Sequence, residues 1–181
     1  MAGLDPAIEE AKPMKFRDLL WRNMTGFDLG DVESIAAQVH PSFYEAPDVL
    51  AERQALYRDG AYLLEIGDRP AGYVLSHPWR FGTAPALNSK LGALPPDADT
   101  YYLHDLAILP LARRIGAASY IVVALEKHAR ARGLGSMSLV AVNNSRAFWE
   151  KHGFAGVELP GIAEKLQSYE PEARLMAKPL A

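Results

Sequence analysis

The sequence has 181 residues, a length typical of one domain with one sizeable hydrophobic core. Hydrophobic residues make up 49% and charged residues 23% of it, which is the composition of an ordinary globular protein. The 19 basic and 22 acidic side chains give a net charge of −3, so no overall positive field exists and we expect no nucleic-acid partner. The absence of cysteine excludes disulfides, thiolate metal sites and a cysteine nucleophile.

The N-terminal segment, residues 1–14, is acidic and has no apolar centre, so we expect a flexible arm and not a signal peptide. The longest uncharged apolar run, Gly116 to Leu125, is far shorter than the roughly 20 residues that cross a bilayer. The sequence therefore predicts a cytoplasmic protein without membrane contact, in which a single domain spans residues 15–181.

The sequence pattern in the first half of the chain predicts a strand, two helices and a hairpin. Residues 16–24 form the first strand, and apolar residues at helical spacing over 32–39 form the first helix. A second helix is expected from Pro47 to a stop at Gly60. The β-rich runs 61–66 and 71–76, joined by Gly, Asp, Arg and Pro, should pair as an antiparallel hairpin.

The second half begins with a loop, Pro78 to Thr100, that is longer than an idle connection normally is. A strand is expected at 101–109 and a helix at 116–132, followed by a strand at 136–142 that should lie parallel to the first. The last predicted elements are a short helix at 144–152 and a strand at 174–178.

The junction between strand 101–109 and the following helix combines small residues with two arginines. Arg113, Arg114, Gly116, Ala117 and Ala118 stand there in the sequence ARRIGAA. Because the first N–H groups of a helix are unpaired and partly positive, a diphosphate would fit this position. Neither the P-loop string nor the dinucleotide fingerprint is present. In the alternative interpretation, the small residues only allow close packing and the arginines are solvated.

A second motif follows strand 136–142 directly, in the sequence NNSRAFWEKHGF. Its characteristic residues are Ser145, Phe148, Trp149, Gly153 and Phe154. In the alternative interpretation this is a short capped helix whose aromatic residues belong to the core.

Together the two motifs resemble those of the GCN5-related N-acetyltransferase (GNAT) family. Arg113, Gly116 and Ala118 match the first family motif and follow the usual proline, here Pro110. The order of elements also matches from about Lys15 to the end of the chain. The resemblance implies an α/β fold with a mixed central sheet flanked by helices.

The resemblance implies that acetyl-CoA, as co-substrate, lies in a V-shaped opening where strands 101–109 and 136–142 splay apart. The pyrophosphate would lie over residues 113–118, and no metal is expected. The implied cofactor contacts are Leu106 and Ile108 through their backbone, then Arg113, Arg114, Gly116, Ala117 and Ala118, and either Asn143 or Asn144.

The implied reaction is direct attack by a primary amine on the thioester, through a tetrahedral intermediate. The family places a general-acid tyrosine where this chain has Trp149, and an indole has no acidic proton near neutral pH, so that role does not carry over. For the base we consider His104 and Asp105, and we favour Asp105 slightly. As neighbours in a strand they should face opposite sides, so that only one points toward the acceptor. Each could instead be a structural residue.

Two loops are expected to form the acceptor pocket, the first with Phe43, Tyr44 and Glu45, the second beginning with His77, Trp79, Arg80 and Phe81. They could equally be solvated loops with an aromatic side chain tucked back onto the core. The sequence thus predicts an enzyme that acetylates a small-molecule or protein amine, and it leaves a homodimer open. The alternatives are a non-catalytic acyl-CoA-binding module and a structural domain whose glycines serve packing alone.

Overall fold

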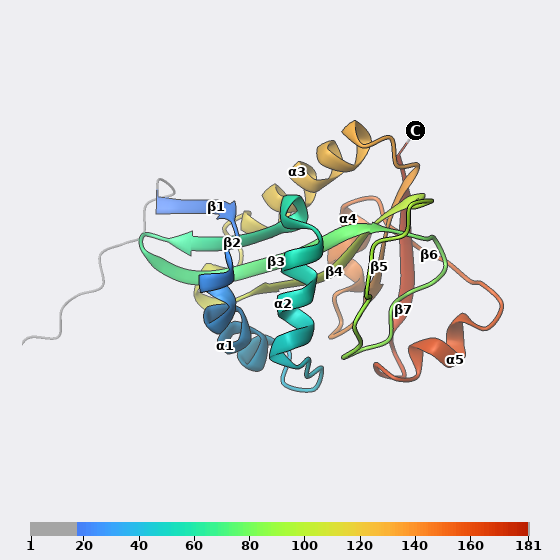
Figure 1. The fold of residues 1–181 in the computed structure, drawn as a ribbon, viewed down its shortest axis with the longest axis horizontal. Helices are drawn as coiled ribbons and strands as arrows, with labels where there is room; N and C mark the ends of the chain where they lie inside the picture. The colour runs from blue at the N-terminus through green and yellow to red at the C-terminus, as the bar shows by residue number, and fades with distance from the viewer. Residues whose placement is uncertain (1–17, 181) are drawn as a thin grey trace, which may run out of the picture.

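The computed structural model describes residues 18–180. The predicted arm at 1–14 lies outside the described residues, as do residues 15–17 and 181. The strands are β1 (Leu19–Asn23), β2 (Ala61–Ile66), β3 (Arg69–Trp79), β4 (Thr100–Ile108), β5 (Ser136–Ala141), β6 (Ala155–Gly156) and β7 (Arg174–Pro179) (Figure 1). The helices are α1 (Leu29–Val39), α2 (Pro47–Leu56), α3 (Ala117–Ala131), α4 (Arg146–Lys151) and α5 (Ile162–Leu166).

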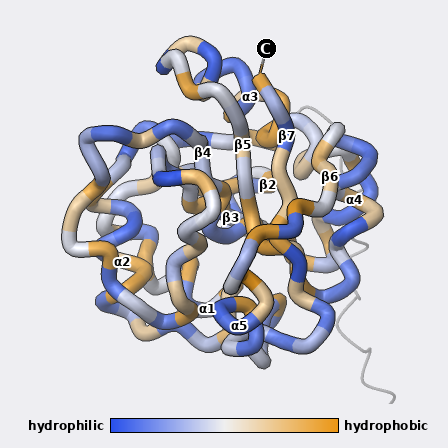
Figure 2. The backbone as a smooth tube through the Cα atoms, turned by 90° about the vertical axis from the view of Figure 1, so that its right-hand side faces the viewer, coloured by the Kyte–Doolittle hydropathy of each residue, from blue (hydrophilic) through white to orange (hydrophobic). Residues whose placement is uncertain are grey.

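The strands form one sheet in the order β1-β2-β3-β4-β5-β7-β6. The β4 and β5 strands pair in parallel, whereas all other neighbours in the sheet are antiparallel. Figure 2 looks onto β5 and β7, which lie side by side. The predicted α/β fold with a mixed sheet is confirmed, and so are the hairpin and the parallel pair.

The helices cover both faces of this sheet (Figure 1). Helices α1 and α2 bury Val32, Ile35 and Leu50 against one face, and α3 buries Ile121 and Leu125 in the core of the other. The apolar residues recur at three- and four-residue intervals, which places them on one side of each helix. Within residues 18–180, no helix is long and apolar enough to cross a membrane.

A β-bulge interrupts the pairing of β3 with β4. Leu75 lies opposite Asp105 and Ser76 lies opposite Leu103, so His104 is an extra residue in β4. A bulge breaks the alternation of side chains along a strand. His104 and Asp105 consequently both point to the face covered by α1 and α2, and the expectation that they face opposite sides is wrong.

The β3 strand is longer than predicted and contains Pro78 and Trp79, which the sequence placed in the long loop. Pairing with β2 ends at Leu75, so the β2 side of β3 is a free edge beyond that residue. A proline is tolerated on a free strand edge, because no ladder hydrogen bond is lost there. The long loop therefore begins only after Trp79 and ends before β4.

Candidate active site

Strands β4 and β5 separate after a short stretch of parallel pairing. Their register runs from Thr100 opposite Ser136 to Leu103 opposite Leu139 and ends there. From His104 to Ile108 the edge of β4 that faces β5 has no strand partner, so its backbone N–H groups there are available to a ligand.

A cavity of about 200 Å³, the cofactor cavity, lies in this opening. Among the predicted cofactor residues, Leu106, Ile108, Ala118 and Asn143 line it. Its other walls are His40, Leu103, His104, Asp105, Leu139, Val140, Val142, Ser145, Phe148 and Trp149. Asn144 does not line this cavity but a neighbouring polar pocket.

The predicted diphosphate position forms the turn into α3, whose first turn borders the cofactor cavity through Ala118. Gly116 caps the helix with φ +81°, and Arg114 has φ +65°. The first hydrogen bond of the helix runs from the N–H of Tyr120 to the carbonyl of Gly116, so the three N–H groups before it have no partner within the helix. The Arg113 Nε donates to the carbonyl of Ile108 at 3.0 Å. These groups give the turn the polarity that attracts an anion.

A second and smaller cavity, the acceptor cavity, measures about 40 Å³. It shares His40, His104, Asp105, Val140 and Val142 with the cofactor cavity. Its remaining walls are Phe43, Glu45, Leu87, Tyr102 and Tyr169. The five shared residues form a common wall between the two cavities.

Of the predicted acceptor residues, Phe43 and Glu45 line this acceptor cavity. The side chain of Tyr44 points outward, with 66% of the residue exposed. Trp79 pairs with Thr100 at the far end of β3, and its Nε1 donates to the carbonyl of Thr83. The structure therefore brings Glu45 together with both predicted catalytic residues and places Tyr44 and Trp79 away from them.

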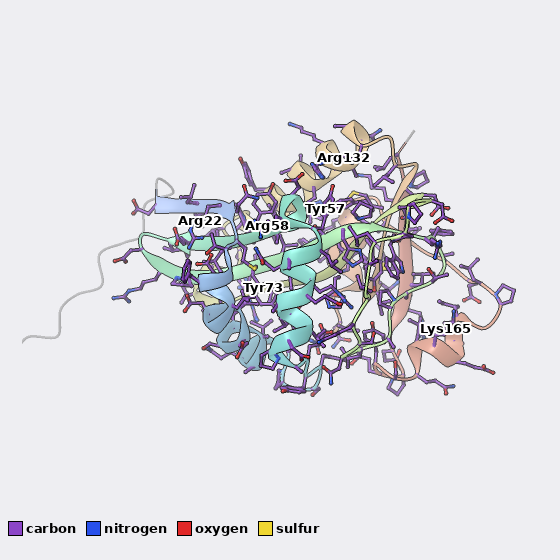
Figure 3. All side chains as sticks on the ribbon, viewed as in Figure 1. Arg22, Tyr57, Arg58, Tyr73, Arg132 and Lys165 are labelled. Atoms are coloured by element: carbon purple, nitrogen blue, oxygen red, sulfur yellow. The ribbon has the colours of Figure 1, made fainter. Side chains whose placement is uncertain are left out.

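Two imidazole–carboxylate pairs occupy the walls of the acceptor cavity. The Nε2 of His104 lies 2.6 Å from Oε1 of Glu45, and the Nε2 of His40 lies 2.9 Å from Oδ1 of Asp105. The second carboxylate oxygen of Asp105 accepts a hydrogen bond from the hydroxyl of Tyr73, which lies on β3 between α1 and α2 in Figure 3. One carboxylate oxygen of Asp105 thus faces an imidazole, and the other accepts from a phenol.

This arrangement shifts the pKa values of the groups around Asp105. Burial raises the pKa of the Asp105 carboxyl, but the hydrogen bond and charge of His40 and the bond from Tyr73 outweigh it, so the pKa is lowered overall. Burial lowers the pKa of His40, but the Asp105 carboxylate outweighs this and raises it. Burial, together with the same carboxylate, raises the pKa of the Tyr73 phenol well above its ordinary value. Near neutral pH, Asp105 is therefore an anion that faces the His40 ring and accepts a hydrogen bond from Tyr73.

His40 is a site residue that the sequence analysis did not find. It ends α1, and its Nδ1 lies 3.1 Å from Nδ2 of Asn143, at the end of β5. The sequence signal for it was weak, because a histidine after the last turn of a helix is also a common cap. His40 thereby links the common wall to the loop that follows β5.

The family model described as "Acetyltransferase (GNAT) family" matches residues 16–154. The chain belongs to the acetyltransferase (GNAT) family. A comparison with curated protein sequences gives no significant match.

Solved structures of other GNAT proteins share the fold at low sequence identity. The GphF GNAT-like decarboxylase in complex with isobutyryl-CoA has 17% identity and a TM-score of 0.74, over 90% of this chain and 100% of that one. Arabidopsis thaliana Naa50, in complex with the bisubstrate analogue CoA-Ac-MVNAL, has 16% identity and a TM-score of 0.65, over 89% and 98%. The Escherichia coli ribosomal-protein-S18-alanine N-acetyltransferase has 17% identity and a TM-score of 0.63, over 90% and 94%.

Trp149 stands where the GNAT resemblance implies a tyrosine. Its side chain packs into the wall of the cofactor cavity. The indole Nε1 donates to Oγ of Ser145 at 3.2 Å, and the ring packs edge-on against Phe148 and Phe154. No tyrosine is among the described residues that line the cofactor cavity. The imidazoles among the side chains that line it are those of His40 and His104. Residues 18–180 hold no cluster of three or more potential metal ligands.

Proposed function

We propose that this GNAT chain transfers the acetyl group of acetyl-CoA to a primary amine. The observation that carries the proposal is the separation of β4 from β5 after Leu103, which opens the cofactor cavity beside the first turn of α3. An elongated acyl-CoA suits this combination, because its pantetheine arm needs backbone partners and its diphosphate needs N–H donors.

Two of the structural neighbours support the choice of cofactor. The GphF protein is described in complex with isobutyryl-CoA, and Naa50 with an analogue in which coenzyme A is joined to an acetylated peptide. In our proposal the Arg113–Ala118 turn receives the diphosphate, and the free edge of β4 receives the pantetheine arm and the thioester carbonyl. Asn143, which lines the cofactor cavity, is favoured over Asn144 as a further contact.

The transfer forms a C–N bond between the amine nitrogen and the acetyl carbon, and it breaks the C–S bond of the thioester. The backbone N–H groups on the free edge of β4 stabilise the oxyanion of the tetrahedral intermediate. The proton lost by the amine ends on the thiolate of coenzyme A. Because Trp149 cannot donate a proton to the thiolate, we assign this proton transfer to the imidazoles of the common wall or to water beside them.

A non-catalytic acyl-CoA-binding module is the second candidate, and the observation that favours it is Trp149 in the position of the family's acid. Binding alone needs the turn before α3 and the edge of β4, but neither of the two imidazole–carboxylate pairs. The two candidates therefore differ in turnover and not in affinity for acetyl-CoA.

Thermal unfolding with acetyl-CoA, with ATP and NAD as controls, tests the cofactor. A ligand at about 100 times its Kd stabilises the native state by about 2.7 kcal/mol, which at roughly 2–4 °C per kcal/mol is readily measured for a domain of this size. Selective stabilisation by acetyl-CoA, followed by release of free thiol with at least one amine, supports the enzyme. Stabilisation without turnover for any amine supports the binding module. No shift at millimolar acetyl-CoA contradicts the cofactor assignment.

The cytoplasmic location, the lack of nucleic-acid and membrane partners, the lack of a metal and the homodimer remain predictions from the sequence.

A further inference from the structure

One wall of the acceptor cavity comes from a segment of the long loop, residues 85–92, which we call the strap. Leu87 is the strap residue that lines the cavity, together with Phe43 and Tyr169 from other parts of the chain. An amine that reaches the thioester from this side must fit between Leu87 and the His104–Glu45 pair.

The first half of the strap is held by hydrogen bonds to the loop before α2 and to the C-terminal region. The hydroxyl of Tyr169 donates to the carbonyl of Pro85 at 2.6 Å. The backbone N–H of Ala46 donates to Oδ1 of Asn88 at 2.7 Å, and the N–H of Asn88 donates to Oε2 of Glu45 at 3.2 Å. Glu45 therefore joins the strap and His104 through one carboxylate.

The second half of the strap is held by α2. The Nη2 of Arg53, a residue only 1% exposed, donates to the carbonyl of Ser89 at 2.9 Å. The carboxylate of Glu52 accepts hydrogen bonds from the N–H groups of Leu91, at 2.7 Å, and Gly92, at 3.1 Å. Bonds that include ionised groups are stronger than neutral ones, so the strap is a fixed wall and not an open rim.

The size of the acceptor cavity limits what it can receive. A water molecule needs roughly 10–15 Å³ of such space, so a cavity of about 40 Å³ has room for a group of about three to four heavy atoms. A polypeptide N-terminus carries a side chain and a continuing backbone beside the reacting nitrogen, which is more than a space of this size holds.

The chemistry of the walls matches a compact amine. The Nε2 of His104 is taken by Glu45, whereas its Nδ1 is buried and has no hydrogen-bond partner among the described residues. A buried nitrogen of this kind is costly unless a ligand or water pairs with it, and an amine N–H would satisfy it. Phe43, Leu87 and Val142 would cover a short apolar substituent.

From the small volume, the apolar lining and the unpaired nitrogen, we infer that the acceptor is a compact small-molecule primary amine, received by His104 in the acceptor cavity, and not a polypeptide N-terminus. The inference rests on the proposed acetyl transfer. It separates this chain from neighbours whose descriptions name a peptide or a ribosomal-protein alanine as acceptor.

The test measures thiol release from acetyl-CoA by the full chain, with straight-chain primary amines from methylamine to hexylamine and with short peptides that have free N-termini. We expect kcat/KM for the best compact amine to exceed that for every peptide by at least tenfold. Leu87→Ala should widen the cavity and move the preferred amine to a longer chain. Leu91→Ala, in the same strap but outside the cavity wall, is the matched control and should leave the preference unchanged.

If Leu87→Ala does not fold, Tyr169→Phe serves instead, because it keeps the ring and removes the hydroxyl that bonds to the carbonyl of Pro85 and to Tyr102. Peptides that react as fast as the compact amines would overturn the inference while leaving acetyl transfer in place. Selective stabilisation by acetyl-CoA without thiol release from either class would refute acetyl transfer itself, and the acceptor class with it.

Discussion

Replacing Asp105 by asparagine tests the electrostatics of the common wall. The substitution keeps the size of the side chain and one acceptor oxygen, but it removes the negative charge that faces His40 at 2.9 Å. Because the pKa of Asp105 is lowered in the folded protein, its contribution to stability is present above about pH 4 and is lost as the pH falls through its folded pKa. Because the pKa of His40 is raised, its contribution is present below about pH 6.5 and is lost as the pH rises through its folded pKa.

The pair therefore stabilises the fold most between about pH 4 and 6.5. Removing one partner of a buried ion pair costs about 3–5 kcal/mol when the other must stay charged. The cost here should be smaller for two reasons. His40 can lose its proton, and the side chains of His40 and Asp105 are still 15% and 16% exposed to solvent. We expect Asp105→Asn to lower the free energy of unfolding by about 2–3 kcal/mol at pH 5.5 and by about 1 kcal/mol at pH 8, where mainly the bond from Tyr73 is weakened.

Urea unfolding of the parent protein and of Asp105→Asn at pH 5.5 and pH 8 measures these free energies. The comparison is valid when the dependence of the unfolding free energy on urea concentration is the same for both proteins. Asp97→Asn removes an exposed carboxylate that pairs with Arg80, and as a control it should change the free energy by less than about 0.5 kcal/mol at either pH. In a His40→Gln background, Asp105→Asn should lose its pH dependence. A cost for Asp105→Asn that is equal at the two pH values, or larger at pH 8, would refute this account of the wall.

Three further substitutions test the cofactor site and the core. Gly116→Ala meets no atom within 4 Å but forces an alanine to φ +81°, so it should cost about 1–2 kcal/mol of stability and weaken acetyl-CoA binding, as measured by thermal shift. Trp149→Phe removes the bond to Ser145 but no acidic proton, so thiol release should stay within a few-fold of the parent rate; a loss of 100-fold or more would show that the indole acts in catalysis. Gly60→Ala would place its Cβ 2.2 Å from the carbonyl oxygen of Ser76, so calorimetry should find a loss of several kcal/mol, and an unchanged Tm would contradict this packing.

The sequence predicted the architecture because that depends on periodic patterns. Buried residues recur at regular local spacing in the helix that contains Ile121 and Leu125 and in the strands around Leu103 and Leu139. These three elements lie where the sequence predicted them. The two-residue β6 and five-residue α5 were missed, since neither is long enough to show a period. Trp79 was assigned to the loop because Pro78 resembles a strand end, and only the register of β2 shows that this edge is free.

The site was predictable only where it coincides with a motif. The turn at Gly116 and the two candidates His104 and Asp105 follow from local sequence and its family resemblance. The pairs that give these residues their chemistry join positions far apart in the chain, with Glu45 and His104 separated by 59 residues. The pairing of His40 with Asp105 is of the same kind, and no local pattern encodes it.

The β-bulge at His104 explains why both pairs can exist in one wall. In a regular strand one of the two neighbours, His104 or Asp105, would face α3, where Leu103 and Leu106 pack against the apolar core. A carboxylate on that side would lack both its imidazole and its phenol partner, and burying an unpaired charge is costly. The extra residue turns Asp105 back toward Tyr73 and His40 while Leu106 continues the apolar side. One inserted residue thus places both imidazole–carboxylate pairs where the cofactor and acceptor cavities meet.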